Sequence, residues 1–433
     1  MVTGIALFAL VLLMAVLGVP IGFAFGVGGM IAAWVFYGGI DGAYLAGISA
    51  WTSVYSWSLL TLPLFILMGL FAAVCNIGKD AFDSINMWLS KARGGLALVA
   101  TLASALFGAV TGSTTATIAT IGSISLPEMQ RLGYSAPLRT GAVACAGILA
   151  NLIPPSIFAI IYCGITQTSL GQVFIAGLVP GIILTLFFGL TIYIWAQLRP
   201  DIAPISPETF TLRQKISSLR YPLPIVLIFV LVIGGIYTAI FTPTESASIG
   251  SALMLITVLV MRRLNLSRFQ EAVIRTVQIT AYIMLAVVGG KLFLNTLSLT
   301  EFPSSISGFI LGLGLTGIPL MFSIIFLLII LGMFLDPIAM LIMIVPLFLP
   351  SIQAAGFSPV WLGTMTVMLC EIACITPPIA ANIYLAQLVD GKSSVADVVK
   401  GVLPFYVASL LLVVLLVFSP QIALWLPSTM YGG

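Results

Sequence analysis

Gly108-Ala-Val-Thr-Gly-Ser-Thr-Thr115 is a polar, glycine-rich stretch inside an apolar segment, and Gly332-Met-Phe-Leu-Asp336-Pro337 interrupts a second apolar segment much later in the chain. Each is followed by a proline-rich interruption, Asn151-Leu-Ile-Pro-Pro-Ser156 and Ile375-Thr-Pro-Pro-Ile-Ala-Ala-Asn382. Pro20, Pro127, Pro154 and Pro155 each have a proline 223 residues later, at Pro243, Pro350, Pro377 and Pro378. With 24 prolines in 433 residues, roughly one such coincidence is expected at any single offset, so four in matching order predict an internal repeat. Interrupted apolar segments at corresponding positions of two halves are typical of the binding site of a secondary transporter.

The composition places the chain in a lipid bilayer. It is 61% hydrophobic and 7% charged, and a water-soluble fold would have too little polar surface to cover such a core. The first apolar run has no basic segment before it and continues into the next, so we expect a membrane span there and not a cleaved signal peptide. The chain has no histidine, which excludes histidine-based metal sites and Ser-His-Asp chemistry. The basic residues sit in short loops, so no nucleic-acid surface is expected.

Basic segments alternate along the chain with segments nearly free of Lys and Arg. The basic ones lie at 91–93, 131–139, 199–220, 262–275 and 392–400, and the others at 37–50, 164–170, 241–244 and 355–360. Because Lys- and Arg-rich loops stay in the cytoplasm, spans are predicted at 4–18, 20–37, 52–75, 137–163 and 171–198, then at 222–241, 243–262, 276–298, 361–387 and 400–426. Five spans per half invert the second half relative to the first and put both termini outside.

Two apolar pieces, 95–126 and 315–349, begin and end on the same side of the membrane, so they are predicted to be re-entrant helical hairpins. The predicted fold is an all-α polytopic membrane protein with two inverted-topology repeats, each of about five transmembrane helices plus one hairpin. The repeats are residues 1–205 and 222–433, joined by a cytoplasmic linker at 206–221. Residues 79–90 and 299–307, just before each hairpin, are predicted to be interfacial amphipathic arms.

At the offset of 223, Ser113 corresponds to Asp336, so both hairpin tips carry an oxygen-bearing side chain beside a glycine or proline. At such a tip the carbonyl end of one helix suits a cation and the amide end of the next suits an anion. Pro154–Pro155 and Pro377–Pro378 interrupt the partner spans and free backbone carbonyls, and Thr376 adds a hydroxyl. Any one of these residues alone more simply kinks a helix. The pattern repeated at one offset favours a paired ion and substrate site.

Ionisable residues within the predicted spans are few. Asp336 is expected to serve the site, and Glu371 fits a structural hydrogen bond as well as a substrate contact. Arg139 and Arg262 lie at the ends of predicted spans and no arginine lies deeper within one, and Lys291 lies toward the outer end of its helix. The anion is therefore expected to contact hairpin amides and the hydroxyls of Ser113, Thr114, Thr115 and Thr376.

These motifs resemble the large membrane subunit of the tripartite ATP-independent periplasmic (TRAP) transporters over essentially the full length. The matching segments are Leu17-Gly-Val-Pro-Ile21, Thr61-Leu-Pro-Leu-Phe65, Thr111-Gly-Ser-Thr-Thr115, Leu126-Pro-Glu-Met129 with Arg131-Leu-Gly-Tyr134, Ile153-Pro-Pro-Ser156, Phe241-Thr-Pro-Thr-Glu245, Gly332-Met-Phe-Leu-Asp336, and Thr376-Pro-Pro378 with Asn382. The resemblance implies sodium-driven uptake of a small organic anion, such as sialic acid, a C4-dicarboxylate or a 2-oxo acid, by an elevator movement of interleaved scaffold and transport subdomains. It implies no catalytic residues and no cofactor beyond Na⁺ as the coupling ion. It also implies two partners, a small four-helix membrane subunit and a periplasmic substrate-binding protein, and a location in a bacterial or archaeal inner membrane.

Carried over by position, the resemblance implies sodium ligands at Gly112, Ser113, Thr115, Gly147, Asn151 and Pro154 for one ion and at Gly332, Asp336, Thr376 and Pro378 for another. It implies substrate contacts at Ser113, Thr114, Thr115, Asn151, Thr376 and Asn382. At Thr117, where many relatives have aspartate, this chain is neutral.

Three other functions compete with this interpretation. A stand-alone sodium- or proton-coupled anion symporter of a related inverted-repeat fold needs no binding protein. An intramembrane hydrolase needs a paired aspartate, a Ser-His pair or a metal, which the predicted spans do not offer. A gated channel fits poorly with two opposed hairpins, which favour an occluded site over an open pore.

Overall fold

The computed structural model describes residues 2–54, 57–302, 305, 308 and 317–430. Every regular element within these ranges is helical, which confirms the predicted all-α class. By length and composition, four helices there can each cross a bilayer: α11 (Leu170–Leu198), α14 (Pro243–Val260), α15 (Leu266–Leu297) and α22 (Val395–Phe418). Four bent helix pairs pass the same test when each pair is taken as one span.

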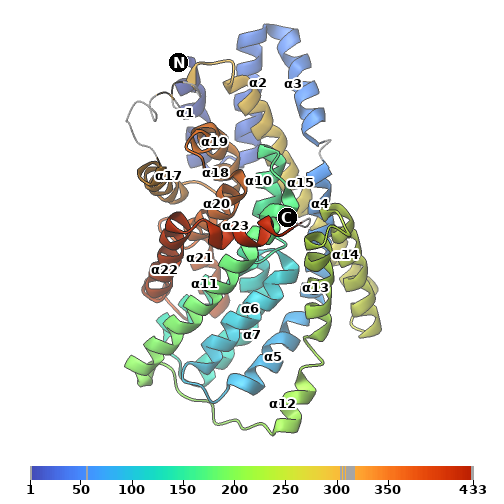
Figure 1. The fold of residues 1–433 in the computed structure, drawn as a ribbon, viewed down its shortest axis with the longest axis vertical. Coiled ribbons are helices and arrows are strands. Elements are labelled where there is room, and N and C mark those ends of the chain that lie inside the picture. The colour runs from blue at the N-terminus through green and yellow to red at the C-terminus, as the bar shows by residue number, and fades with distance from the viewer. Residues whose placement is uncertain (1, 55–56, 303–304, 306–307, 309–316, 431–433) are drawn as a thin grey trace.

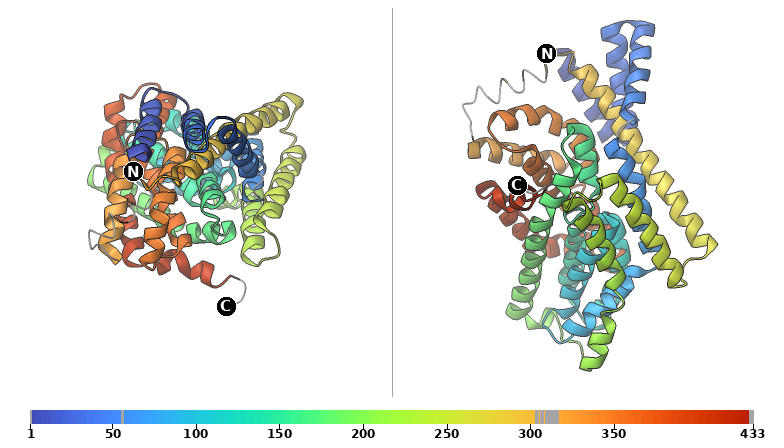
Figure 2. Two further views of the ribbon diagram at one scale, coloured as in Figure 1. Left: turned by 90° about the horizontal axis from the view of Figure 1, so that it is seen from above. Right: turned by 45° about the vertical axis from the view of Figure 1, so that its right-hand side comes forward.

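One side of the molecule is a layer built around α15, with α2 (Ile21–Tyr37), α3 (Gly39–Val54) and α4 (Trp57–Val74) packed on it (Figures 1 and 2). Helix α14 completes this layer by packing on α4. Helices α2 and α15 pack with their backbones in contact. A Cβ on Gly289 would lie 2.4 Å from the carbonyl oxygen of Gly22, and a Cβ on Gly29 would lie 2.8 Å from the amide nitrogen of Phe293. Small residues permit this approach where apolar lipid gives no hydrophobic drive for helices to associate. We call these five helices the α15 layer.

The other side holds the hairpins and the interrupted helices, which we call the hairpin body. Its helices from the first half are α6 (Gly95–Thr111), α7 (Thr114–Arg131), α8 (Ala136–Ala146), α9 (Leu149–Leu152), α10 (Ile157–Thr166) and α11. Those from the second half are α17 (Gly317–Gly332), α18 (Pro337–Met343), α19 (Val345–Ala354), α20 (Pro359–Ala373), α21 (Ala381–Asp390), α22 and α23 (Gln421–Ser428). Helix α13 (Leu223–Tyr237) contacts α14 of the α15 layer and α6 and α11 of the hairpin body.

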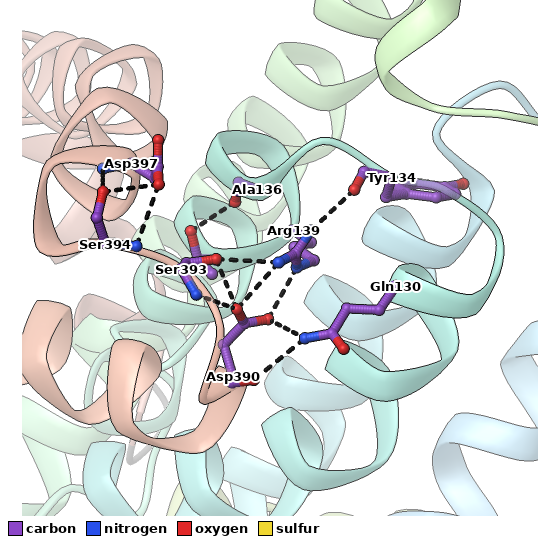
Figure 3. A network of polar contacts seen from close by, with 9 residues as sticks. Gln130, Tyr134, Ala136, Arg139, Asp390, Ser393, Ser394 and Asp397 are labelled. Carbon is purple, nitrogen blue, oxygen red and sulfur yellow. Dashed lines mark hydrogen bonds and ion pairs between the residues drawn. The ribbon is translucent and has the colours of Figure 1, made fainter.

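The two halves of the chain are interlocked within the hairpin body. Helices α8 and α22 touch so closely that a Cβ on Gly141 would lie 2.3 Å from the carbonyl carbon of Gly401. Beside this contact, the guanidinium of Arg139 forms a buried ion pair with Asp390, with Nε–Oδ1 and Nη2–Oδ2 distances of 2.8 and 3.0 Å (Figure 3). The Gln130 side-chain amide donates to the same carboxylate at 2.8 Å. Burial alone would raise the pKa of Asp390, but the hydrogen bonds from Arg139, Ser393 and Gln130 outweigh it and lower that pKa.

The helix bounds depart from the predicted spans in several places. The predicted span 400–426, for example, is divided into α22 and α23. Residues 37–50, predicted as an outer connection, are mostly helical, because α3 returns along α2 and packs on α2 and α15. Helix α15 begins at Leu266, ten residues before the predicted span at 276, because Asn265 caps it by accepting a hydrogen bond from the Arg268 amide at 2.9 Å.

The segments predicted as arms and linker are partly helical and partly outside the described residues. The first arm is α5 (Ile77–Leu89), bent by 63° from α4. The second arm, at 299–307, lies partly outside the described residues, as do residues 315–316 of the second hairpin. The linker at 206–221 contains α12 (Leu212–Ser218), and a 3-10 turn, η1 (Pro200–Ile202), precedes it. The remaining described helix is α1 (Val2–Val16).

Candidate functional site

The first hairpin turns at Gly112, whose φ of 57° is in the left-handed region that favours glycine. Ser113 caps α7 by accepting a hydrogen bond from the Ala116 amide at 3.4 Å, and its hydroxyl oxygen lies 3.2 Å from that of Thr115. This tip therefore presents two neighbouring hydroxyl oxygens at the start of α7. Both line the cavity described below.

Each hairpin tip packs against an interrupted helix. A Cβ on Gly112 would lie 2.6 Å from the carbonyl oxygen of Pro155, in the break between α9 and α10. A Cβ on Gly332 would lie 2.6 Å from the Cβ of Ala373, at the end of α20. Both breaks contain a cis Pro-Pro peptide, Pro154–Pro155 and Pro377–Pro378. The pairing of each tip with an interruption is the one that the sequence pattern predicted.

The second tip leads from α17 into α18 at Asp336. Its carboxylate caps α18 by accepting a hydrogen bond from the Ile338 amide at 2.9 Å. Asp336 is thus the N-cap of α18, a role that aspartate commonly has, and its side chain also lines the cavity. Thr376 differs, because it follows the end of α20 and does not line that cavity; its hydroxyl donates to the carbonyl of Ile372, in the last turn of α20, at 2.7 Å.

A buried carboxylate in α20 joins the two halves at the site. One oxygen of Glu371, Oε1, accepts hydrogen bonds from the Thr114 hydroxyl and the Asn151 side-chain amide, both at 2.7 Å. Asn151 in turn accepts from the Ile157 amide at 3.2 Å, so it holds the start of α10 as well. Glu371 is 0% exposed, and its second oxygen has no hydrogen-bond partner within the described part of the chain. Of the two roles left open from the sequence, the structural hydrogen bond is present.

Both tips and both interrupted helices open onto one cavity of about 560 Å³. The α15 layer forms its opposite wall, through α4 and α15. The side chains that carry polar or charged groups into the lining are Thr111, Ser113, Thr114, Thr115, Asn151, Arg275, Tyr282, Asp336, Cys374 and Asn382. The rest of the lining is mainly apolar, which is typical of small-molecule sites.

The cavity gathers most of the residues predicted to contact substrate: Ser113, Thr114, Thr115, Asn151 and Asn382. Thr376 is the exception. Asn382 is almost fully buried, and its side-chain nitrogen has no hydrogen-bond partner among the described residues. Of the predicted sodium ligands, Ser113, Thr115, Asn151 and Asp336 line the cavity, whereas Gly112, Gly147, Pro154, Gly332 and Pro378 do not.

Sequence reasoning missed the arginine at this site. Because α15 starts at Leu266, Arg275 lies on this helix and lines the cavity, whereas the sequence pattern predicted it in the basic segment before the span at 276–298. Its guanidinium pairs with Glu271 one turn earlier at 2.9 Å, with both side chains substantially exposed. Exposed pairs at this spacing contribute only about 0.3–0.5 kcal/mol. Asn265 is a favourable N-cap residue, and this signal in the sequence would have moved the predicted start of the helix to Leu266. Lys291 lines a different pocket, with Thr52 and Asn295.

Comparison with protein families gives one match over most of the chain. The profile described as "Tripartite ATP-independent periplasmic transporter, DctM component" matches residues 8–422. A C4-dicarboxylate TRAP transporter large permease protein of Pseudomonas aeruginosa is 34% identical over 375 residues, which cover 86% of each chain. An ectoine/5-hydroxyectoine TRAP transporter large permease protein of Ruegeria pomeroyi is 36% identical over 382 residues, covering 85% of this chain and 86% of the relative.

Among solved structures, the Alcanivorax borkumensis YdaH transporter, described as having an unusual topology, is similar in fold. The TM-score is 0.63 at 13% identity, over 90% of both chains. At this identity the likeness concerns the fold alone.

Proposed function

The chain belongs to the DctM family of tripartite ATP-independent periplasmic transporters, and from this premise we propose that it carries a small organic anion inward together with Na⁺. It is a large permease subunit and not an enzyme. The observation that carries the proposal is the single cavity onto which both hairpin tips and both interrupted helices open.

The chemistry of the cavity suits an anion with an apolar body. Ser113 begins α7, so the first turn of that helix presents amide groups and the positive end of its dipole. The hydroxyl of Thr115 and the amide group of Asn382 add donors around this point, whereas the Thr114 hydroxyl donates to Glu371. Relatives named for C4-dicarboxylates and for ectoine suggest a small carboxylate.

We place two sodium ions beside the tips. The first would use the hydroxyl oxygens of Ser113 and Thr115 with backbone oxygens between Gly147 and Pro154, a pairing supported by the contact of Gly112 with Pro155. The second would use the Asp336 carboxylate with backbone oxygens near Gly332, Thr376 and Pro378. Hard cations prefer such oxygen ligands.

The movement that we propose is an elevator displacement of the hairpin body along the α15 layer. The interlocked halves of the hairpin body support this division, because α8 and α22 have to move as one unit. The partners would be a small four-helix membrane subunit and a periplasmic binding protein. The setting would be an inner membrane with both termini on the periplasmic side.

Reconstituted uptake tests the function. Proteoliposomes holding this chain with its small subunit should accumulate sialic acid, a C4-dicarboxylate or a 2-oxo acid only with an inward Na⁺ gradient and the binding protein present. Sodium-driven uptake without any binding protein would support the stand-alone symporter instead. Uptake unaffected by Na⁺ would contradict the coupling.

Asp336→Asn should weaken the sodium dependence of uptake strongly, because a carboxylate supplies most of the charge compensation for one cation in a low-dielectric site. Ser113→Ala should have a smaller effect, since one of several neutral oxygens is lost. The measurement is the Na⁺ concentration giving half-maximal uptake, with thermal unfolding as the control for folding. An unchanged sodium dependence in Asp336→Asn would remove this residue from the site.

A further inference from the structure

We infer that Arg275 forms an anion subsite at the cytoplasmic end of the cavity, which takes a carboxylate or sulfonate group of the substrate as it leaves the hairpin tips. The inference rests on the proposed inward transport of an organic anion and adds a second contact point, on the opposite wall. Arg275 is the basic side chain among the described residues that line the cavity, and Asp336 is the acidic one.

The position of Arg275 along α15 separates it from the tips. Arg275, Ile279, Tyr282 and Ile283 recur at helical spacing on the cavity face of α15. Seven residues of helix place Arg275 about 10 Å from Tyr282 along the axis, toward the N-terminal end of α15. That end carries Arg262, Arg263 and Arg268, which favour the cytoplasmic side.

The present partner of Arg275 is one that a substrate can replace. Glu271 binds one terminal nitrogen of the guanidinium, Nη2 to Oε1 at 2.9 Å, and the side-chain exposures are 59% for Arg275 and 42% for Glu271. A guanidinium can bind a carboxylate through two parallel hydrogen bonds, which are stronger than a single exposed contact. An anion arriving in the cavity can therefore compete with Glu271, and Glu271 can displace the anion again on release.

The two walls of the cavity would then bind the substrate differently. Neutral donors at the hairpin tips move with the hairpin body, whereas Arg275 belongs to the α15 layer. The subsite predicts asymmetric recognition, with Arg275 affecting substrate that approaches from the cytoplasm and leaving delivery from the outside largely unchanged.

The test compares Arg275→Gln and Arg275→Lys with Arg262→Gln as the matched control. Arg262 lies in the loop before α15, is exposed and does not line the cavity, so its variant removes the same charge from the same region. Succinate, pyruvate and N-acetylneuraminate are the probes, measured as half-saturating concentrations for exchange from the cytoplasmic face and for binding-protein-dependent uptake. Anion-dependent thermal shifts of the purified membrane complex provide a readout that needs no transport.

For a transported probe, Arg275→Gln should raise the half-saturating concentration at the cytoplasmic face about tenfold, as loss of a charge-assisted contact predicts. Arg275→Lys should restore part of the lost affinity at the cytoplasmic face. The half-saturating concentration for binding-protein-dependent uptake should change less than about twofold in either variant. If Arg275→Gln and Arg262→Gln have equal half-saturating concentrations at the cytoplasmic face, the inference is overturned. The proposed function still holds in that case if the wild type shows sodium- and binding-protein-driven uptake. Absence of any anion-dependent thermal shift in the wild type would overturn the subsite as well, whereas failure of the proposed function shows as absent sodium- and binding-protein-driven uptake.

Discussion

At the scale of single residues, Glu371 links the first hairpin to the second half of the chain through hydrogen bonds. One carboxylate oxygen accepts from Thr114 at the start of α7 and from Asn151 in α9, although 220 or more residues separate each from Glu371. A buried acid with two strong donors on one oxygen keeps three helices in register. Without it the Thr114 hydroxyl would lose its acceptor, and the Asn151 amide would keep only the Thr114 hydroxyl oxygen at 3.0 Å.

Glu371→Ala should lower the free energy of unfolding by about 3 kcal/mol, since the Thr114 hydroxyl loses its acceptor and the Asn151 amide loses one of its two, at roughly 1–3 kcal/mol for each lost bond. Glu371→Gln should cost much less because it retains the Oε1 acceptor. Thr366→Val is the matched control: Thr366 is fully buried in the same helix, and its hydroxyl has no hydrogen-bond partner among the described residues. Thermal unfolding of the purified subunit measures all three, and an alanine variant as stable as the glutamine variant would contradict the network.

At the scale of elements, the hairpins and broken helices were predictable from the sequence, and their partners across the chain were not. Gly112, Asp336 and the paired prolines mark interruptions, because glycine and proline change the backbone locally. The bond between Glu371 and Thr114 depends on how helices from two halves pack, which no local pattern encodes. Arg275 was assigned to a loop because a run of basic residues was weighted above the Asn265 cap that begins α15.

Gly332→Ala should impair the second hairpin, because its new Cβ would lie 2.6 Å from the Cβ of Ala373. Overpacking of this kind costs about 1–3 kcal/mol. Adding Ala373→Gly removes the opposing atom and should restore much of the stability and uptake. Gly234→Ala in α13, where nothing lies within 4 Å of the new Cβ, is the control. Failure of the double variant to recover would show that the tip contact is not what limits the single variant.

At the scale of the whole molecule, the Arg139–Asp390 pair holds α8 and α21 together within the hairpin body (Figure 3). Removing one partner of a buried pair costs about 3–5 kcal/mol, because the other charge stays buried and unpaired. Asp390→Ala should therefore destabilise the subunit strongly, and combining it with Arg139→Met should recover part of the loss. Thermal unfolding tests this, and simple addition of the two single effects would argue against direct coupling.

The lowered pKa of Asp390 also gives the pair a pH dependence. Its stabilisation is complete above the ordinary aspartate pKa near about 4 and is lost as the pH falls through the lower, folded-state value. Acid should thus narrow the difference in stability between wild type and Asp390→Ala. A difference that stays constant down to strongly acidic pH would contradict this assignment.

The inverted-topology prediction is testable at the same scale. Gln167 and Ser217 are both exposed, and the alternation of basic loops places them on opposite sides of the membrane. Single cysteines there should react with an impermeant thiol reagent from opposite faces, and the native cysteines are buried and should remain silent. Labelling of both positions from one side would overturn the two-repeat topology.

The backbone contact between Gly141 and Gly401 has a consequence for biosynthesis. Helix α8 ends at Ala146 and α22 begins at Val395, so about 250 residues have to be made before α8 meets the surface that covers it. At about 5–20 residues per second, that interval is roughly 10–50 s. Throughout this interval, the glycine face of α8 and the Arg139 guanidinium lack the partners that cover them. A ribosome that stalls midway therefore leaves α8 without its covering helix, and the hairpin body assembles only once translation has nearly finished.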